Sequence, residues 1–149
     1  MTENRFWRLD CHPEGSDFEN ALSLQTEDLA PLSEGEVRVK VGWLSMDAGT
    51  RMWMSPRTDG YQPPLPLGSK MSGLVLGQVS ETRDPAFPVG VLVRGFGQWA
   101  DYATMIPALA GLEIVDETLG DIRHHFGALG MNAWTAYVGV KEVAAIKPG

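Results

Sequence analysis

The clearest pattern in this sequence is a strict alternation of apolar and polar residues from Glu36 to Leu44. A period of two predicts a β-strand with one face turned to the core. The apolar row of this strand is made of Val37, Val39, Val41 and Trp43, with Arg38, Lys40 and Gly42 between them. The tripeptide at 33–35 predicts a turn just before it.

Shorter apolar runs predict further strands, and residues 18–24 are the expected partner of the strand at 36–44. The other predicted strands cover residues 5–9, 74–79, 91–95, 99–105 and 112–115. Asp47 is a candidate N-cap for one short helical turn. Four prolines between 55 and 68 lack a backbone donor, so this segment is predicted to be a loop.

The last third changes to a helical pattern, with helices expected at 121–129 and 131–145. The second helix carries two apolar stripes: Met131, Trp134 and Val138 on one side, and Ala133, Ala136, Tyr137, Val140 and Ala144 on the other. A helix that is apolar nearly all round is normally buried on two faces. A β-barrel covers one face, so the other predicts either a layer that these residues do not contain or a homodimer contact.

Composition narrows the class of protein. Seventeen glycines and ten prolines in 149 residues break the chain into many brief elements, as in all-β barrels. A net charge of −7 argues against a nucleic-acid partner. A single cysteine excludes an intrachain disulfide, and the lack of a long apolar run argues against a membrane span or signal peptide. We therefore expect a cytoplasmic protein of one domain.

Two common kinds of site are not predicted. A zinc site needs about three converging ligands, and the candidates Cys11, His12, His124 and His125 do not provide them. The two adjacent histidines are expected to face solvent on a short helix. Gly73 and Gly77 lack the spacing of a dinucleotide fingerprint, and are expected at bulges or corners of a barrel.

Six segments, in this order, resemble a known family. They are residues 35–41; residues 44–47 with Arg51 and Met54; Tyr-Gln-Pro-Pro-Leu-Pro-Leu-Gly at 61–68; residues 87–93; Gly-Gln-Trp-Ala-Asp-Tyr at 97–102; and residues 129–137. Together they look like the N-terminal domain of the zinc-independent medium-chain dehydrogenase/reductases. The branch that they resemble contains the NADPH-dependent alkenal, prostaglandin and curcumin reductases.

This resemblance implies a mainly-β, GroES-like barrel with a few short flanking helices, which is followed in the family by a Rossmann domain. The tripeptide Lys-Pro-Gly at 147–149 resembles the family's linker into the first Rossmann strand. Residues 1–149 are therefore expected to form the substrate-binding domain, cut at that linker. By itself this domain is not expected to catalyse the reaction, because in the family the Rossmann domain binds the phosphates of the cofactor.

The resemblance also implies site residues. Tyr61 matches a tyrosine that lines the family's cleft, and a tyrosine keeps its proton at neutral pH, which suits a donor to an enolate oxygen. A tyrosine that packs on the loop prolines is the alternative for Tyr61. Thr135 is the expected partner of the nicotinamide carboxamide, with Met131 and Asn132 beside it. The residues expected to border the substrate pocket are Arg51 and Met71.

Departures from the family motif leave other functions open. Residues 47–51 read Asp-Ala-Gly-Thr-Arg where the family has Asp-Pro-Tyr-Met-Arg, so an aromatic residue near the substrate is missing. Reduction of enones or alkenals with NADPH is the function expected first. A quinone oxidoreductase is one alternative, and a non-catalytic GroES-like binding or assembly module is another.

Overall fold

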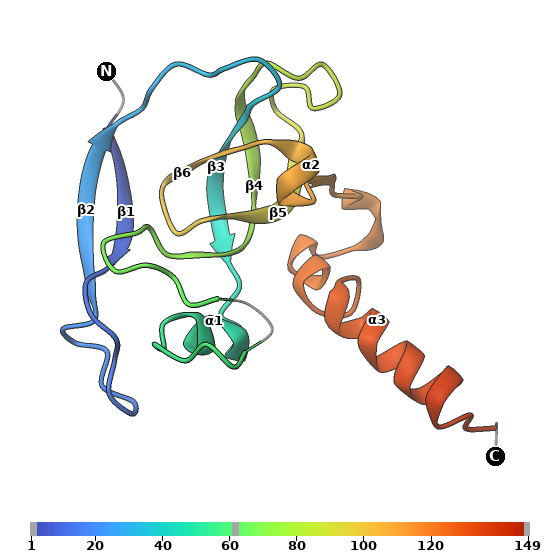
Figure 1. Ribbon diagram of the computed structural model, residues 1–149. Helices are drawn as coiled ribbons and strands as arrows, with labels where there is room; N and C mark the ends of the chain where they lie inside the picture. The colour runs from blue at the N-terminus through green and yellow to red at the C-terminus, as the bar shows by residue number, and fades with distance from the viewer. Residues whose placement is uncertain (1–2, 61–62, 148–149) are drawn as a thin grey trace. The chain divides into compact units, whose positions relative to one another are not determined.

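The computed structural model describes residues 3–60 and 63–147 and divides the chain into two compact units. Unit 1 extends to Ile114 and contains all the named strands, whereas unit 2 begins at Val115 and is helical (Figure 1). The mainly-β fold class expected from the sequence is confirmed.

A five-stranded antiparallel sheet forms the centre of unit 1, in the order β6-β3-β4-β5-β7. Its strands are β3 (Val37–Leu44), β4 (Ser72–Thr82), β5 (Leu92–Gln98), β6 (Tyr102–Met105) and β7 (Glu113–Ile114). The alternation that predicted β3 puts its valines at 37 and 39 in the core with no exposed surface. They pack with Val75, Val79, Val93, Ala103, Met105 and Leu112.

The alternation of β3 breaks near its end, and one prediction is corrected there. The register shifts between Val41 and Trp43, so that Gly42 is an extra residue opposite β4. An extra residue reverses the side on which the following side chains lie. Trp43 is consequently 40% exposed, and Leu44 packs against the core in its place.

A separate two-stranded sheet is formed by β1 (Glu3–Leu9) and β2 (Leu22–Asp28). The strand expected at 18–24 therefore begins later and pairs with β1 rather than β3. Turn chemistry explains the shift. Gly15 has a φ of +56°, and the Asp17 carboxylate accepts a hydrogen bond from the Glu19 amide, so residues 14–20 form turns instead of a strand.

The predicted strand at 99–105 is also shorter than expected, because its first three residues join the two sheets. Ala100 forms an isolated antiparallel bridge with Phe6 of β1. The Trp7 amide donates to the Trp99 carbonyl at 2.9 Å, and the Asp101 amide donates to the Arg5 carbonyl at 2.9 Å. Strand β6 starts only after this crossing.

Two short helices complete unit 1. Helix α1 (Ala48–Trp53) follows β3, with Asp47 at the N-cap position as predicted, although its carboxylate makes no capping bond. Helix α2 (Pro107–Ala110) ends at Gly111 in the left-handed conformation. A second core cluster lies near α1 and consists of Leu9, Ala21, Met54, Met71 and Trp99.

Unit 2 contains shorter helices than the sequence predicts. The helix expected at 121–129 is a 3₁₀ segment, η2 (Ile122–Phe126), preceded by η1 (Glu117–Leu119). The helix expected at 131–145 is α3 (Met131–Val138), which continues as a π-helical segment, η3 (Gly139–Val143). No residue of α3 or η3 is buried in the structure.

Gly77 is predicted to be intolerant of a side chain. A Cβ at this position would lie 2.2 Å from the Lys40 carbonyl oxygen. Strands β3 and β4 would have to move apart to accommodate it. We expect Gly77→Ala to lower the free energy of unfolding by about 2–3 kcal/mol in a urea titration.

Gly42→Ala is the matched control, because a Cβ there would lie at an ordinary 3.7 Å from the Leu76 carbonyl oxygen. It should change stability by less than about 1 kcal/mol. Equal effects of the two substitutions would show that the close approach at Gly77 is not a constraint.

Candidate functional site

Helix α1 begins in a small polar cluster at the end of β3. The Ser45 hydroxyl donates to the Asp47 carboxylate at 2.7 Å, and the Ser45 amide donates to the Leu74 carbonyl at 2.9 Å. The Thr50 amide donates to the Asp47 carbonyl, which closes the first turn of α1. The Asp47 side chain is exposed and remains available to solvent on its other lone pairs.

Near α1, the buried polar atoms Thr50 Oγ1, Trp53 Nε1 and Trp99 Nε1 make no hydrogen bond to any residue that the structure describes. Two of them lie one turn apart on α1. Trp53 also packs its ring edge-on against Phe96, with the centroids 5.4 Å apart. A buried polar group without a hydrogen-bond partner lowers the stability of the fold by about 1–3 kcal/mol. The packing of apolar groups around α1 must therefore offset this cost.

Arg51 is in α1, and its guanidinium contacts the segment that joins β1 to β2. Its Nη2 donates to the Pro13 carbonyl at 2.9 Å and to the Gly15 carbonyl at 3.2 Å. The Phe18 ring lies 5.7 Å from its Cζ atom. Arg51, which was expected to border a substrate pocket, therefore ties α1 to the segment between β1 and β2.

Two other predicted residues are found as follows. Met71 has no exposed surface and belongs to the second core cluster, where it can shape a pocket only through its neighbours. Tyr61 lies outside the described residues. After it in the chain, the Leu65 amide donates to the Trp53 carbonyl at 2.8 Å.

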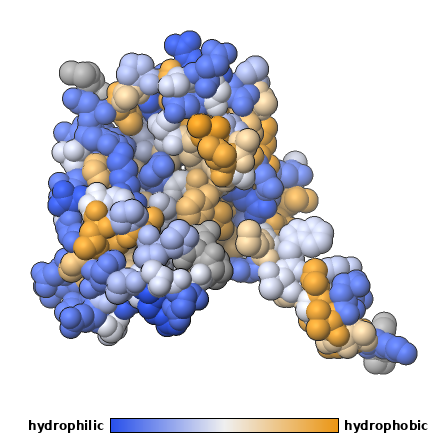
Figure 2. Space-filling view, in the orientation of Figure 1, coloured by the Kyte–Doolittle hydropathy of each residue, from blue (hydrophilic) through white to orange (hydrophobic). Residues whose placement is uncertain are grey.

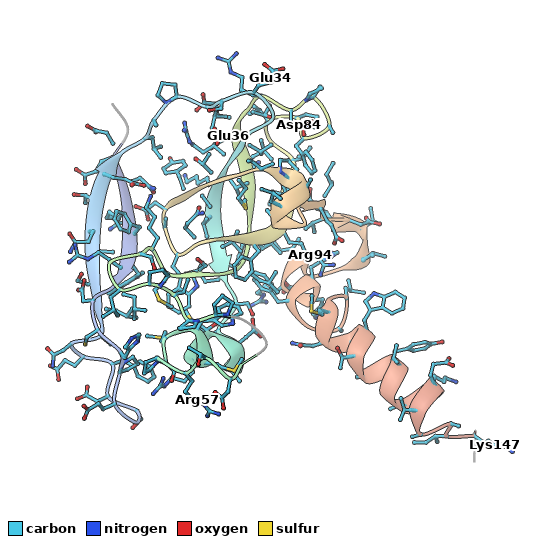
Figure 3. The ribbon with its side chains drawn as sticks, viewed as in Figure 1. Glu34, Glu36, Arg57, Asp84, Arg94 and Lys147 are labelled. Atoms are coloured by element: carbon cyan, nitrogen blue, oxygen red, sulfur yellow. The ribbon has the colours of Figure 1, made fainter. Side chains whose placement is uncertain are left out.

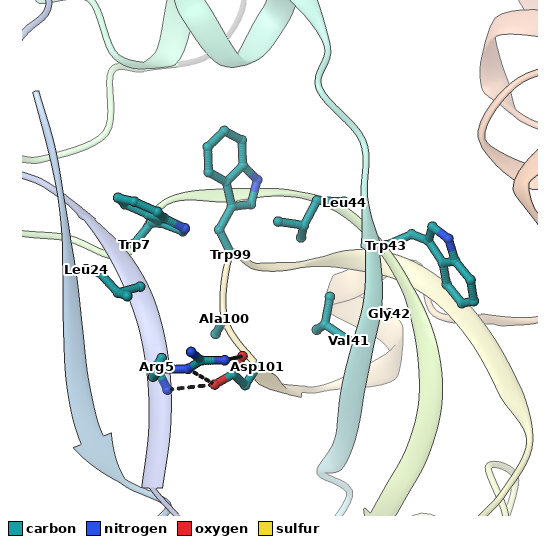
Figure 4. A pocket seen from close by; sticks show the side chains of 10 residues that line it. All are labelled: Arg5, Trp7, Leu24, Val41, Gly42, Trp43, Leu44, Trp99, Ala100 and Asp101. Carbon is teal, nitrogen blue, oxygen red and sulfur yellow. Dashed lines mark hydrogen bonds and ion pairs between the residues drawn. The ribbon is translucent and has the colours of Figure 1, made fainter. Parts of the chain in front are cut away.

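Unit 1 contains a cavity of about 370 Å³ that the sequence did not indicate. It lies between the two-stranded sheet and the later half of β3 (Figure 4). Its lining residues are Arg5, Trp7, Leu24, Val41, Gly42, Trp43, Leu44, Trp99, Ala100 and Asp101. Of its three tryptophans, Trp7 and Trp99 lie on one side, and the indole of Trp43 points away from them.

An ion pair closes the lower end of this cavity in Figure 4. Arg5 Nε donates to Asp101 Oδ2 at 2.7 Å, and Arg5 Nη2 donates to Oδ1 at 3.1 Å. The hydrogen bonds from the Arg5 side chain lower the pKa of the Asp101 carboxyl, against the smaller opposing effect of desolvation. Asp101 is therefore ionised at neutral pH.

A weak signal for this ion pair exists in the sequence. Arg5 and Trp7 are two apart, as are Trp99 and Asp101, so each pair falls on one side of an extended segment. On each of the two segments, this spacing places a charged side chain and an indole on the same side. The spacing does not indicate that the segments meet, because 96 residues separate Arg5 from Asp101.

In unit 2, the predicted cofactor residues all lie on α3. Met131 is 71% exposed, and Asn132 and Thr135 are exposed. The Thr135 hydroxyl donates to the Met131 carbonyl one turn earlier, at 3.0 Å. Its hydrogen is thus engaged, while the lone pairs of its oxygen face outward and can accept a further bond.

The same helix carries an apolar surface. A groove of about 460 Å³ is lined by Ala128, Leu129, Gly130, Ala133, Trp134 and Tyr137. Trp134 and Tyr137 are 68% and 55% exposed, and their rings meet edge-on with centroids 6.3 Å apart. Apolar residues are visible on this helix in Figure 2. In the structure, no residue of either predicted apolar stripe of this helix is buried.

The adjacent histidines behave differently from each other. His124 is exposed as expected, whereas His125 is 9% exposed, and its Nε2 lies 3.3 Å from the Asp116 carbonyl oxygen. The prediction that both face solvent is wrong for His125, because the tight 3₁₀ turn directs it inward. Among the described residues, no group of three or more His, Cys, Asp or Glu side chains could hold a metal ion.

The sequence of unit 1 matches a known protein family. A family model described as the N-terminal domain of oxidoreductase matches residues 5–115. The chain belongs to this oxidoreductase family. The match covers nearly all of unit 1, including both walls of the cavity between β1 and β3, so the resemblance seen in the sequence motifs is confirmed.

Individual members of the oxidoreductase family agree with the match. The chain is 32% identical over 150 residues to an NADPH-dependent curcumin reductase of Escherichia coli (strain K12), covering 98% of this chain and 41% of the relative. It is 32% identical over 155 residues to prostaglandin reductase 1 of Oryctolagus cuniculus, covering 100% and 41%. The chain thus spans about two fifths of the length of these relatives.

A solved structure shows the same fold. The crystal structure of CurA from Vibrio vulnificus superimposes with a TM-score of 0.85 at 26% identity, covering 98% of this chain and 42% of CurA. CurA has also been crystallised in complex with NADPH.

The helices of the described residues are all too short or too polar to cross a membrane.

The Arg5–Asp101 pair predicts a pH-dependent contribution to stability. Because the folded pKa of Asp101 is lowered, the pair stabilises the fold above the unfolded pKa of about 3.9, and this is lost as the pH falls through the folded value. We expect Asp101→Asn to unfold at lower urea concentration than the unchanged chain at pH 7. The difference should shrink steadily below about pH 4.

Asp59→Asn is the control, because Asp59 forms a local ion pair with Arg57 two residues away, and both side chains are more than 65% exposed. Local exposed pairs contribute little to stability. A difference for Asp101→Asn that stayed constant from pH 7 to pH 2 would contradict the role given to the ion pair.

Proposed function

We propose that this chain is the substrate-binding part of a zinc-independent, NADPH-dependent reductase of activated carbon–carbon double bonds. The observation that carries the proposal is the agreement of sequence and fold along nearly the whole chain. Relatives named as curcumin, prostaglandin and 2-alkenal reductases align over 93–100% of it. The proposed substrate is a small enone or alkenal.

The binding of NADPH requires a second domain in this proposal. The 149 residues contain no Gly-x-Gly-x-x-Gly turn between a strand and a helix, which is the usual site for the pyrophosphate. We therefore propose that residues 1–149 act as a substrate-binding domain together with a nucleotide-binding domain, and that they do not oxidise NADPH alone. No metal ion takes part.

The residues present on α3 fit a nicotinamide. The Thr135 oxygen can accept a bond from a carboxamide N–H, because its own hydrogen is given to Met131. Gly130, at the N-cap of α3, offers no side-chain bond to the first turn, so amides there are open to a ribose or carboxamide oxygen. Met131 and Asn132 are exposed beside them. These three side chains would hold the nicotinamide end of the cofactor.

Beyond these cofactor contacts, the reaction needs from this chain a hydrogen-bond donor to the substrate and a pocket to hold it. When bound, NADPH supplies the hydride that adds to the β-carbon of the substrate. Negative charge then develops on the carbonyl oxygen, and a proton must reach the α-carbon. Tyr61 is proposed to donate a hydrogen bond to that oxygen, a contribution of about 3–4 kcal/mol for one well-placed donor. Arg51 and Met71 are proposed to shape the substrate pocket from α1 and from the core beneath it.

The remaining parts of the proposal concern environment and partners. The single cysteine is free and exposed, which suits a reducing compartment, and we place the protein in the cytoplasm. The uncovered apolar face of α3 is proposed to pack against the nucleotide-binding domain or, when that domain is absent, against a second copy of the chain.

Kinetics of the full-length gene product test the function. With an enone and NADPH, we expect Tyr61→Phe to lower kcat by about 150- to 900-fold, since it removes one donor to the developing oxyanion. We expect Thr135→Val to act mainly on the KM for NADPH, since it removes an acceptor for the cofactor.

Tyr102→Phe provides the matched control, because it makes the same chemical change within β6. It should leave both constants near their original values. An unchanged kcat in Tyr61→Phe would contradict the role given to Tyr61. No turnover of any enone or quinone by the full-length protein would favour a binding module, and a preference for quinones that lack an enone geometry would favour the quinone reductase.

Self-association of the 149-residue chain tests the face of α3. At about 50 μM we expect sedimentation to show a dimer, and we expect Trp134→Asp to shift it toward monomer because the exposed indole is a centre of the contact.

Leu109→Asp serves as the control, because Leu109 is 82% exposed on α2 in unit 1. It should leave the dimer intact. A monomeric chain with α3 still helical by circular dichroism would contradict the proposed contact.

A further inference from the structure

We propose that the cavity between the two-stranded sheet and β3 is a binding site for a small, neutral aromatic molecule that carries a carbonyl group. None of the residues that line this cavity is among those proposed above to contact the cofactor or the reduced substrate. The inference therefore goes beyond the proposed function and does not depend on it.

Backbone hydrogen bonds fix the walls of this cavity. The Trp7 amide donates to the Trp99 carbonyl at 2.9 Å. The Asp101 amide donates to the Arg5 carbonyl, and the Asp101 carbonyl accepts from the Val41 amide, both at 2.9 Å. The crossing segment is thus bonded to β1 on one side and to β3 on the other. The cavity is consequently present before a ligand arrives, and binding would require little reordering of the backbone.

The apolar part of the lining is only partly covered by protein. Trp7 and Leu24 are direct partners across β1 and β2, and they are 40% and 51% exposed. Trp99 adds a second indole on the Trp7 side (Figure 4). Apolar surface that is left exposed in a concave site is typical of ligand-binding pockets. Two indoles on one side favour an aromatic ligand, because aromatic rings pack on one another edge-on or in offset stacks.

Two hydrogen-bond donors at this cavity have no partner among the described residues. One is the indole nitrogen of Trp7, which lies on the Trp99 side of its ring in Figure 4. The other is Nη1 of Arg5, because the hydrogen bonds of this guanidinium use Nε and Nη2. Indole and guanidinium N–H groups donate and do not accept. The ligand is therefore expected to bring an acceptor, such as a carbonyl oxygen.

The charges at the cavity favour a neutral ligand. Arg5 and Asp101 form a bidentate pair, with N···O distances of 2.7 and 3.1 Å, so their charges compensate each other. The other side chains that line the cavity carry no charge. A charged ligand would find no unpaired opposite charge there, and the net charge of −7 on the chain further disfavours an anion.

The volume of the cavity limits the size of the ligand. At about 370 Å³ it is near the lower end of the range for small-molecule pockets, which is about 300–1,000 Å³. A single ring system with a short carbonyl substituent is thus the class of ligand that the lining, the free donors and the volume select together.

Acetophenone is the probe of choice for the inference. It is a neutral aryl ketone whose only C=C bonds are in the ring, so it is not a substrate of the proposed reaction. In proton–nitrogen NMR correlation spectra of the 149-residue chain, we expect it to shift the indole N–H signals of Trp7 and Trp99. The shifts should saturate with a Kd of about 0.1–1 mM. The signal of Trp134, in unit 2, should not move.

Two matched compounds separate the parts of the argument. Benzoate keeps the ring and replaces the neutral ketone with an anion, whereas cyclohexyl methyl ketone keeps the carbonyl and removes the aromatic ring. We expect each to bind at least about tenfold more weakly than acetophenone, because each loses one of the properties that the cavity selects.

Substitutions of tryptophan locate the site. We expect Trp7→Leu to weaken acetophenone binding at least about tenfold, read from the Trp99 signal, since it removes a ring and a donor. Trp7→Phe keeps a ring and should weaken binding about threefold, which also keeps the test open if Trp7→Leu does not fold. Trp43→Leu is the matched control, because the indole of Trp43 points away from the other two. It should change the Kd by less than about twofold.

Asp101→Asn tests the charge argument separately. It leaves the Arg5 guanidinium without its carboxylate partner, so the cavity gains an unpaired positive charge. We expect this variant to bind benzoate at least about tenfold more tightly than the unchanged chain does at pH 7.

Three results would overturn the inference. The first is the absence of a saturable shift of the Trp7 and Trp99 signals with about 10 mM acetophenone in the folded chain. The second is equal binding of acetophenone and cyclohexyl methyl ketone, or equal effects of Trp7→Leu and Trp43→Leu. The third is a shift confined to Trp134, which would assign the compound to the groove on α3 instead. Charge variants Arg57→Gln and Arg94→Gln, labelled at two other places in Figure 3, should leave acetophenone binding unchanged.

Discussion

The crossing of residues 99–101 over β1 is the contact on which unit 1 depends. Along three residues, Trp99 accepts from the Trp7 amide and donates to the Met71 carbonyl, and Asp101 bonds to Arg5 through both backbone and side chain. The Asp101 carbonyl also accepts from the Val41 amide. This short stretch joins the two-stranded sheet to the five-stranded one, and most of its backbone donors and acceptors are satisfied by doing so.

The same crossing creates the surroundings of the candidate site. By turning Trp99 inward it gives the second core cluster its largest side chain, against which Met71, Met54 and Leu9 pack. Met54 is the C-cap residue of α1 and Leu9 ends β1, so the cluster joins the end of α1 to the end of β1. The contact between the sheets and the packing of α1 are therefore supported by the same buried indole.

Local patterns predicted much of the fold. The alternation in β3, the proline-rich loop and the N-cap position of Asp47 depend on neighbours in sequence, and all three were found. The motif resemblance predicted the family and the mainly-β barrel class. The position of β2 was missed because the turn residues at 15 and 17 overrode the apolar residues beside them, and the outward turn of Trp43 was missed because a bulge is set by the partner strand.

The candidate site was predicted less completely. Resemblance supplied names for site residues, but it did not reveal that Arg51 grips the carbonyls of Pro13 and Gly15. Nor did it reveal the cavity, since the two segments that form its ion pair are remote in sequence. Contacts of this kind arise from the meeting of distant elements, for which neither periodicity nor composition gives a signal.

The bridge between Phe6 and Ala100 has a consequence for how the chain is made. Strand β1 finds its second partner only after about a hundred further residues have been synthesised, which takes on the order of 5–20 seconds. Until then the β1–β2 hairpin presents an open edge and the indole of Trp7 to the surrounding medium. Nascent chains of this fold are consequently expected to be substrates for chaperones that shield such edges.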